Sequence, residues 1–149
     1  MRADKLGFID SNIIVYAIDE ESPFFKKANH FINQIDKLDM NVCISPQIVG
    51  EVYSIITNPK RVRKPLNPEQ AVEIIEAILE SDAFIKIYPK IDTMRTTINI
   101  IKQYQIRANN FYDAQIVATM LDNNISLIYT VNVKDFEIFK EIKVINPLK

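Results

Sequence analysis

The sequence predicts an α/β protein in which a central parallel sheet of about five strands lies between two layers of helices. Three observations lead to this three-layer class. Short apolar runs alternate with longer segments whose apolar residues recur every three or four positions. Cap residues and prolines mark the starts of those longer segments. No repeat, low-complexity tract or flexible linker divides the 149 residues, so we predict one domain over residues 1–149.

Five short apolar runs are the predicted strands. Their nearly continuous apolar character suits strands that are buried on both faces of a sheet. In chain order they are residues 6–9, 42–44, 84–87, 127–129 and 144–145. In parallel sheets of this kind the ligand crevice lies beyond the carboxyl ends of the strands. Asp10 and Thr130 each follow such a run directly, so they are expected at that crevice.

Six helices are predicted between these runs. They cover residues 11–18, 23–35, 46–57, 67–81, 93–104 and 109–122. A cap residue followed by proline opens three of them, at Ser22–Pro23, Ser45–Pro46 and Asn67–Pro68. Ser11 can cap the first helix, and one of the asparagines at 109 and 110 can cap the sixth. The order of strands and helices therefore favours a parallel sheet covered on both faces.

The composition narrows the possible chemistry. The only glycines are Gly7 and Gly50, so glycine-rich phosphate loops cannot be built, and the only histidine is His30. The single cysteine, Cys43, excludes an intramolecular disulfide and a cysteine zinc site. If the protein is an enzyme, it works with carboxylates. The first apolar run is too short for a signal peptide or a membrane helix, so we expect a cytoplasmic protein without membrane contact.

Two acidic residues in the first half are candidates for a functional site. Asp10 ends a buried strand, where an unpaired carboxylate is costly, but a helix cap would explain it equally well. Glu51 belongs to a polar stripe on an otherwise apolar helix. Taken alone, such a stripe favours a solvated face, although this one is narrow and lacks basic partners. The stripe consists of Gln47, Glu51, Ser54 and Asn58.

Two further candidates lie in the second half. Asp113 falls in the first turn of a predicted helix, where its favourable interaction with the helix dipole would be a sufficient structural reason. Asn132 and Asp135 follow the fourth strand. Asp135 could equally cap a final helical turn before Phe136. Each residue has a structural explanation, and only the joint pattern argues for a shared site.

Taken in chain order, the four acidic motifs resemble those of the PIN-domain family of ribonucleases. The motifs are Phe8–Ile9–Asp10–Ser11–Asn12, the helical Glu51, Tyr112–Asp113–Ala114, and the segment from Thr130 to Phe136. The resemblance spans nearly the whole chain. One residue departs from it, because Asn132 stands where many members carry Asp. Either Asp135 supplies the missing charge or a second metal position is weak.

The resemblance implies a metal-dependent endoribonuclease that hydrolyses phosphodiester bonds in RNA. Mg²⁺ or Mn²⁺ would be the cofactor, since both prefer hard oxygen ligands. The implied metal ligands are Asp10, Glu51, Asp113, Asn132 and Asp135, and the four acidic residues among them would carry out catalysis. Asp10 and Asp113 would be the principal ligands, while Glu51 would hold a ligand water or act as general base. Ser11, Asn12 and Thr130 would orient these groups.

One basic run could help RNA reach an acidic site on a chain with a formal net charge of −1. It comprises Lys60, Arg61, Arg63 and Lys64. A solvated basic loop is an equally good interpretation. Small proteins of this kind also resemble the toxin component of VapBC-type toxin–antitoxin systems. That resemblance implies a small antitoxin as partner and a homodimer as the assembly.

Three alternatives were weighed against the nuclease. A haloacid-dehalogenase-type phosphatase needs a second Asp where Asn12 stands, and it needs more chain for its lysine motif and cap. A receiver domain needs a phosphoacceptor Asp after the third strand, where residues 87–89 read Ile-Tyr-Pro. A PIN fold that binds RNA or a partner without cleaving it is kept open by the neutral Asn132.

Overall fold

The computed structural model describes residues 6–37 and 40–149, so residues 1–5 of the predicted domain lie outside the described part. Strands and helices alternate along the chain as predicted. Their order is β1 (Gly7–Ile9), α1 (Ser11–Ile18), α2 (Phe25–Lys37), β2 (Val42–Ile44), α3 (Pro46–Ile56), α4 (Pro68–Glu80), β3 (Phe84–Lys86), α5 (Thr93–Tyr104), α6 (Asn110–Asp122), β4 (Leu127–Tyr129), α7 (Val133–Phe136) and β5 (Lys143–Ile145).

The five strands form one parallel sheet in the order β3-β2-β1-β4-β5. This confirms the predicted parallel sheet. β1 is the central strand, and Phe8 pairs with Cys43 on one side and with Ile128 on the other. The chain reverses its direction across the sheet between β3 and β4. The topological switch point therefore lies at β1 and β4, where a ligand crevice is expected.

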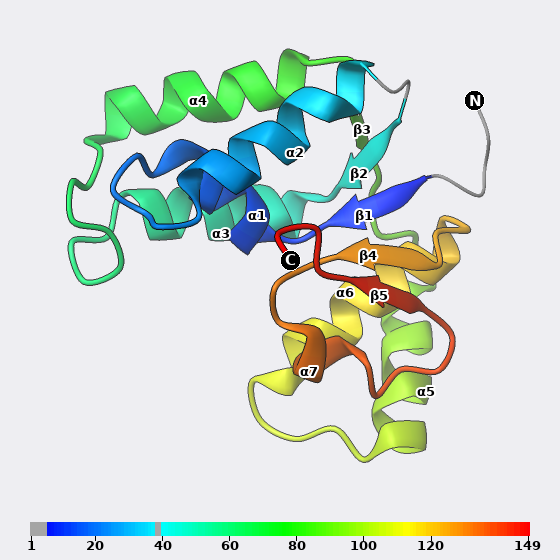
Figure 1. Cartoon of the computed structure of the whole chain (residues 1–149). Helices are drawn as coiled ribbons and strands as arrows, with labels where there is room; N and C mark the ends of the chain where they lie inside the picture. The colour runs from blue at the N-terminus through cyan, green and yellow to red at the C-terminus, as the bar shows by residue number, and fades with distance from the viewer. Residues whose placement is uncertain (1–5, 38–39) are drawn as a thin grey trace.

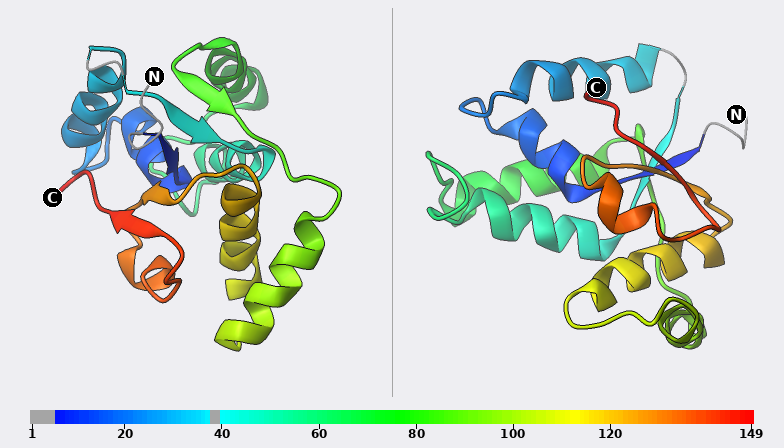
Figure 2. Two further views of the ribbon diagram at one scale, coloured as in Figure 1. Left: turned by 90° about the vertical axis from the view of Figure 1, so that its right-hand side faces the viewer. Right: turned by 60° about the horizontal axis from the view of Figure 1, so that its bottom comes forward.

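The helices form a layer on each side of the sheet, which confirms the three-layer class. Figure 1 shows α1–α4 on one side and α5–α7 on the other, and Figure 2 shows the same division from two further directions. Within the first layer α1 packs against α2 and α3, and within the second α5 packs along α6. This division is the one that right-handed crossovers give for the observed strand order.

The sheet lies in the centre of the apolar core. Every residue of β1 and β2 is buried, as expected for strands covered by helices on both faces. Phe31 of α2 packs against Tyr129 of β4 with 5.1 Å between the ring centroids. A Cβ atom at Gly7 would lie 2.5 Å from Cε2 of Tyr129, so only glycine leaves room for this ring beside β1.

One predicted capping residue and one predicted helix start differ from the structure. Asp10, not Ser11, is the N-cap of α1, because its carboxylate accepts a hydrogen bond from the Ser11 backbone N–H. The second helix begins at Phe25 rather than at Pro23. The Ser22 hydroxyl accepts from the Phe24 N–H and so stabilises a turn that precedes the helix. By contrast, Asn67 opens α4 with the expected cap, in which Gln70 completes a capping box.

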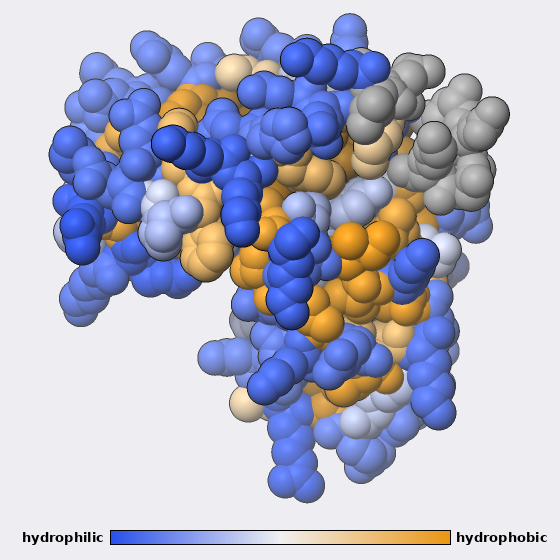
Figure 3. All heavy atoms as spheres, in the orientation of Figure 1, coloured by the Kyte–Doolittle hydropathy of each residue, from blue (hydrophilic) through white to orange (hydrophobic). Residues whose placement is uncertain are grey.

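The surface has a deep notch between the two helical layers. Figure 3 shows it opening between the limb that contains α1–α4 and the limb that contains α5–α7. The carboxyl ends of β1 and β4 face this notch in Figure 1. No helix in residues 6–37 and 40–149 is both long and apolar enough to cross a membrane.

Candidate active site at the carboxyl edge of the sheet

Asp10 is held at the junction of the two central strands. Its backbone N–H donates to the Tyr129 carbonyl at 3.0 Å, which continues the pairing of β1 with β4. Its side chain is 5% exposed and accepts hydrogen bonds through both oxygens. Oδ1 accepts from the Ser11 N–H at 2.8 Å, and Oδ2 accepts from the Thr130 hydroxyl at 2.7 Å. The same carboxylate therefore caps a helix and belongs to the cluster at the notch.

Asn12 and Thr130 connect the strand ends around this carboxylate. The Asn12 amide donates to Oδ2 of Asp10 and to Oγ1 of Thr130, both at 3.3 Å. Its carbonyl oxygen accepts from the Val131 N–H at 3.4 Å, and Oγ1 of Thr130 accepts from the Asn132 N–H at 3.0 Å. These contacts restrict the rotation of the Asp10 side chain. The role of Asn12 and Thr130 in orienting a metal ligand stays a prediction.

Glu51 faces the same notch from α3. Its Oε2 accepts from the Ser11 hydroxyl at 2.9 Å, and its Oε1 accepts from the Gln47 amide at 3.1 Å. The interpretation of Glu51 as part of a merely solvated face is therefore wrong, because two side chains orient its carboxylate. Gln47 also donates to the Tyr112 carbonyl of α6 at 3.4 Å, and so it links the two helical layers across the notch.

Gln47 is a site residue to which the sequence analysis assigned no role. The one signal that could have found it is its spacing, since Gln47 precedes Glu51 by four residues and a helix places such positions one above the other. Its contact with the Tyr112 carbonyl joins two helices that are 65 residues apart in sequence. No sequence pattern marks a contact of that kind.

The carboxylates of the cluster share one electrostatic environment. The pKa of Asp113 is raised to about 7, first by its burial and then by the charges of Asp135, Asp10 and Glu51, in that order. The pKa of Asp10 is raised mainly by its burial and also by the charge of Glu51, while hydrogen bonds from Thr130 and Ser11 oppose this shift. The four acidic residues that the sequence predicted therefore lie within electrostatic range of Asp113 or of one another.

Asn132 and Asp135 lie at the exposed side of the cluster, on α7. Asn132 is the N-cap of this four-residue helix, and its side chain makes no capping hydrogen bond. The alternative role of Asp135 as a cap is therefore wrong, because Asp135 lies inside the first turn. Its charge is nevertheless close enough to raise the pKa of Asp113.

The donor atoms at the notch suit a hydrated divalent cation better than a closed cage of side chains. All the candidate ligands offer oxygen, which Mg²⁺ and Mn²⁺ prefer. Within the described residues, no three His, Cys, Asp or Glu side chains lie close enough to hold one ion together. Mg²⁺ usually keeps several waters and needs only one or two carboxylates. The cluster fits that mode of binding, and a cation would reduce the repulsion that raises the pKa of Asp113.

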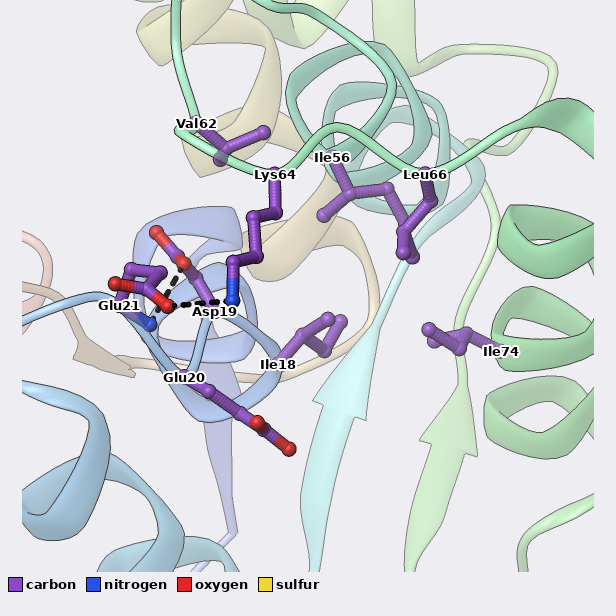
Figure 4. Close-up of a pocket in the computed structure, with 9 residues that line it drawn as sticks. All are labelled: Ile18, Asp19, Glu20, Glu21, Ile56, Val62, Lys64, Leu66 and Ile74. Carbon is purple, nitrogen blue, oxygen red and sulfur yellow. Dashed lines mark hydrogen bonds and ion pairs between the residues drawn. The ribbon is translucent and has the colours of Figure 1, made fainter.

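The basic run lies apart from this cluster. It follows the outer end of α3, at the tip of the upper limb in Figure 1. Lys64 forms an ion pair with Glu21 at 3.1 Å, as Figure 4 shows. Arg61 and Arg63 line a hollow together with acidic and aromatic residues, among them Asp19. The run therefore faces an acidic segment of its own chain.

An apolar hollow of about 360 Å³ lies beneath this ion pair. Figure 4 shows the end of α1, the end of α3, the basic loop and the start of α4 around it. Its apolar lining residues are Ile18, Ile56, Val62, Leu66 and Ile74. Together with Lys64, this lining anchors the basic loop against α1, so the position of the loop depends on packing as well as on charge.

The fold and the site together define a class of protein. It is a parallel α/β domain with a carboxylate cluster at the switch point of its sheet, the place where such folds bind and transform ligands. The chain belongs to the PIN domain family, because the model of that family matches residues 7–142. This confirms the resemblance that the four motifs indicated.

Comparisons with individual proteins agree with this family. The sequence is 23% identical to Ribonuclease VapC24 of Mycobacterium tuberculosis H37Rv over 141 residues, which cover 94% of this chain and 95% of the relative. The fold is similar to that of VapC20 of Mycobacterium tuberculosis, a Sarcin-Ricin loop cleaving toxin, with a TM-score of 0.66 and 16% identity. This match covers 93% of this chain and 98% of VapC20. The fold is also similar to that of a chain in VapBC2 of Rickettsia felis bound to a promoter DNA fragment, with a TM-score of 0.67 and 18% identity. This match covers 95% of this chain and 98% of the other.

Proposed function

We propose that this protein is a metal-dependent endoribonuclease that hydrolyses phosphodiester bonds of RNA at the notch. The observation that carries the proposal is a half-buried carboxylate, Asp113, whose pKa is raised to about 7 by its burial and by the nearby charges of Asp135, Asp10 and Glu51. Clusters that perturb a carboxylate in this way are typical of functional sites. Membership of the PIN domain family and the name of the relative Ribonuclease VapC24 support RNA as the substrate.

Mg²⁺ or Mn²⁺ is the proposed cofactor. The candidate ligands are Asp10, Glu51, Asp113 and Asp135, of which one or two would bind the cation directly and the others through its waters, with Asn132 as a neutral oxygen donor at the exposed side. Such a cation supplies an acidified water and stabilises the charge that develops on the phosphate. The chain has no other obvious means of activating water, because its one histidine lies on α2 and its one cysteine is buried in β2.

The surrounding side chains prepare the carboxylates for this role. Thr130 and Asn12 fix the orientation of Asp10. Ser11 and Gln47 each donate to a different oxygen of Glu51, so this carboxylate is presented in one orientation. In that orientation Glu51 would accept the proton of the attacking water or hold the water in place.

Solved structures with a similar fold support a role as a toxin. The solved neighbours include VapBC toxin–antitoxin complexes, and their toxin chains are matched over nearly their whole length. We therefore propose that this chain is the toxin of such a pair, that it forms a homodimer, and that a small antitoxin blocks its site. Growth arrest on induction of the chain, relieved by a small gene encoded beside it, would test this role.

The cleavage mechanism is tested with Asp10→Asn. This change keeps the size of the side chain and removes one charge from the proposed cation site, so RNA cleavage should fall by at least about a hundredfold. EDTA should abolish cleavage by the unmodified protein, and Mg²⁺ or Mn²⁺ should restore it. The matched control is Asp82→Asn, which makes the same chemical change in the turn before β3, at the opposite edge of the sheet.

The outcome that contradicts the proposal is equally specific. A purified protein that cuts RNA at the same rate in EDTA would exclude a metal mechanism. Circular dichroism of both variants must match the unmodified protein, so that a loss of activity is not a loss of fold.

A second candidate function is RNA or partner binding without cleavage. The neutral Asn132 favours it, since one expected negative charge is missing from the cluster. In this case RNA would bind but stay intact in Mg²⁺ and in Mn²⁺. In either function we propose that Lys60, Arg61 and Arg63 contact flanking phosphates, whereas Lys64 is already paired with Glu21.

A further inference from the structure

A second basic surface lies on α2, outside the site described so far. It surrounds a hollow of about 370 Å³ between α2 and the residues that follow β5. The lining residues are Lys26, Lys27, His30, Phe31, Gln34, Pro147, Leu148 and Lys149. We call the basic members of this set, Lys26, Lys27, His30 and Lys149, the α2 patch. All four are exposed, and no Asp or Glu lines the hollow.

The patch combines residues of α2 with a residue of the segment after β5, which is more than 100 positions away in the sequence. Lys26 and His30 are four residues apart and share one face of α2. The Gln34 amide lies 2.8 Å from a ring nitrogen of His30 and completes that face with a hydrogen bond. Lys149 comes from the segment after β5, which packs beside α2 through the buried side chain of Leu148. No run of basic residues in the sequence marks the patch.

The surroundings of the two basic surfaces differ. At the loop of residues 60–64, Lys64 is paired with Glu21, and Asp19 lies in the neighbouring hollow. Within residues 6–37 and 40–149, Lys26 and Lys27 form no ion pair. Lys26 and Lys27 are therefore available to a partner outside the chain, while on the loop the charge of Lys64 is neutralised by Glu21.

The patch is also connected to the carboxyl edge of the sheet. Thr130 donates its backbone N–H to the Ile145 carbonyl at 2.9 Å, so β5 ends beside the site. Lys149 lies four positions after Ile145, and an extended chain over four such steps spans at most about 14 Å. Figure 1 shows the C-terminal end near the notch, and both views in Figure 2 show it beside α2.

We infer that the α2 patch binds the phosphates of single-stranded RNA on one side of the bond that is cut. The inference rests on the proposed ribonuclease function. An acidic notch repels a polyanion, and the chain as a whole has a formal charge of −1, so the strand needs a local cationic surface close to the site. Lysine ammonium groups interact with phosphate as point charges, so the patch should hold the strand without reading its bases.

The test compares two double variants of the full chain that remove the same charge. Lys26→Gln with Lys27→Gln removes two charges from the α2 patch. Lys102→Gln with Lys143→Gln removes two charges from the end of α5 and the start of β5, away from the carboxyl edge of the sheet. Binding of a short fluorescent single-stranded RNA is measured in EDTA across a salt titration, and cleavage is measured separately in Mg²⁺.

The α2 variant should bind the RNA roughly 2- to 30-fold more weakly, because each of the two exposed charge contacts is worth about 0.2–1 kcal/mol. The slope of log affinity against log salt should fall by about 1.4, since each phosphate contact to a single strand contributes about 0.7. In the control variant, both the affinity for RNA and the slope against salt should fall much less. Turnover at saturating RNA should be unchanged in the α2 variant, because the patch does not touch the reacting phosphate.

The other outcomes separate the inference from the proposed function. If the α2 variant and the control bind RNA equally while cleavage persists, the inference is overturned and the ribonuclease stands. If neither protein cuts RNA but the α2 variant alone binds more weakly, the patch stands and the ribonuclease fails. If the α2 variant loses binding to a polyglutamate peptide but not to RNA, the patch serves an acidic protein partner and the inference is wrong.

Discussion

At the scale of single residues, Asp113 is a carboxylate whose ionisation is opposed by its burial and by its acidic neighbours. Its pKa of about 7 in the folded chain exceeds the value near 4 that an unfolded chain would give it. A raised folded pKa adds stability below the unfolded value, and that stability is lost as the pH rises through the folded value. Asp113 should therefore reduce the stability of the metal-free protein progressively between about pH 4 and pH 7.

Asp113→Asn should remove this part of the pH dependence. In EDTA, the free energy of unfolding from urea titrations should fall less between pH 5 and pH 8 in the variant than in the unmodified protein. At pH 8 the variant should be the more stable of the two. Asp82→Asn, which lies outside the cluster, should follow the unmodified protein. If the free energy of unfolding depends on pH in the same way for all three proteins, the pKa of Asp113 is not raised in the folded chain.

At the scale of secondary-structure elements, Gln47 connects α3 to α6 and thereby sets the position of Glu51 across the notch. Gln47→Leu keeps a similar size and removes both hydrogen bonds. We expect turnover at saturating RNA to fall about 10- to 100-fold, the usual effect of losing a group that orients a ligand. KM should change little, because Gln47 is not expected to hold the strand.

The control for Gln47 lies on the same polar stripe of α3. Ser54 is exposed, and no side-chain hydrogen bond of Ser54 is found in the described residues. Ser54→Ala should therefore leave turnover unchanged. A Gln47→Leu variant with normal turnover, measured with a normal circular dichroism spectrum, would show that Glu51 keeps its orientation without this contact.

The same elements show what could be predicted from the sequence. Strand positions were predicted to within about a residue, because uninterrupted apolar runs leave little choice of where a buried strand lies. The start of α2 was misplaced at Pro23, because the Ser22 hydroxyl can stabilise a turn as easily as a helix. The acidic residues could be proposed from the sequence because each follows a strand or lies on a helix that begins or passes near the carboxyl edge of the sheet, and their role in a site stays a prediction.

Other parts of the site could not be predicted, for a physical reason. The link from Gln47 to the Tyr112 carbonyl, the pairing of Lys64 with Glu21 and the α2 patch all join segments that are distant in sequence. Composition and periodicity describe only neighbours along the chain. Such contacts depend on how the helical layers are placed, which the sequence pattern does not specify.

At the scale of the whole molecule, the two helical layers are held by one sheet and one continuous apolar core. We therefore expect the chain to unfold in a single cooperative transition. Calorimetric and van't Hoff enthalpies should agree, and amides of β2 and β4 should exchange with the same free energy of opening. Two separate transitions, one for each limb around the notch, would contradict the prediction of a single domain over residues 1–149.

The central position of β1 also has a consequence for the order in which the protein is made. Asp10 leaves the ribosome early, but its partners Tyr129 and Thr130 are synthesised about 120 residues later. The central pairing is therefore a contact of high sequence separation, which forms late because a long loop must be closed first. A nascent chain that carries Asp10 and Glu51 lacks Thr130, β4 and the nearby β5. The proposed nuclease should therefore stay inactive until the segment that carries Thr130, β4 and β5 has been translated.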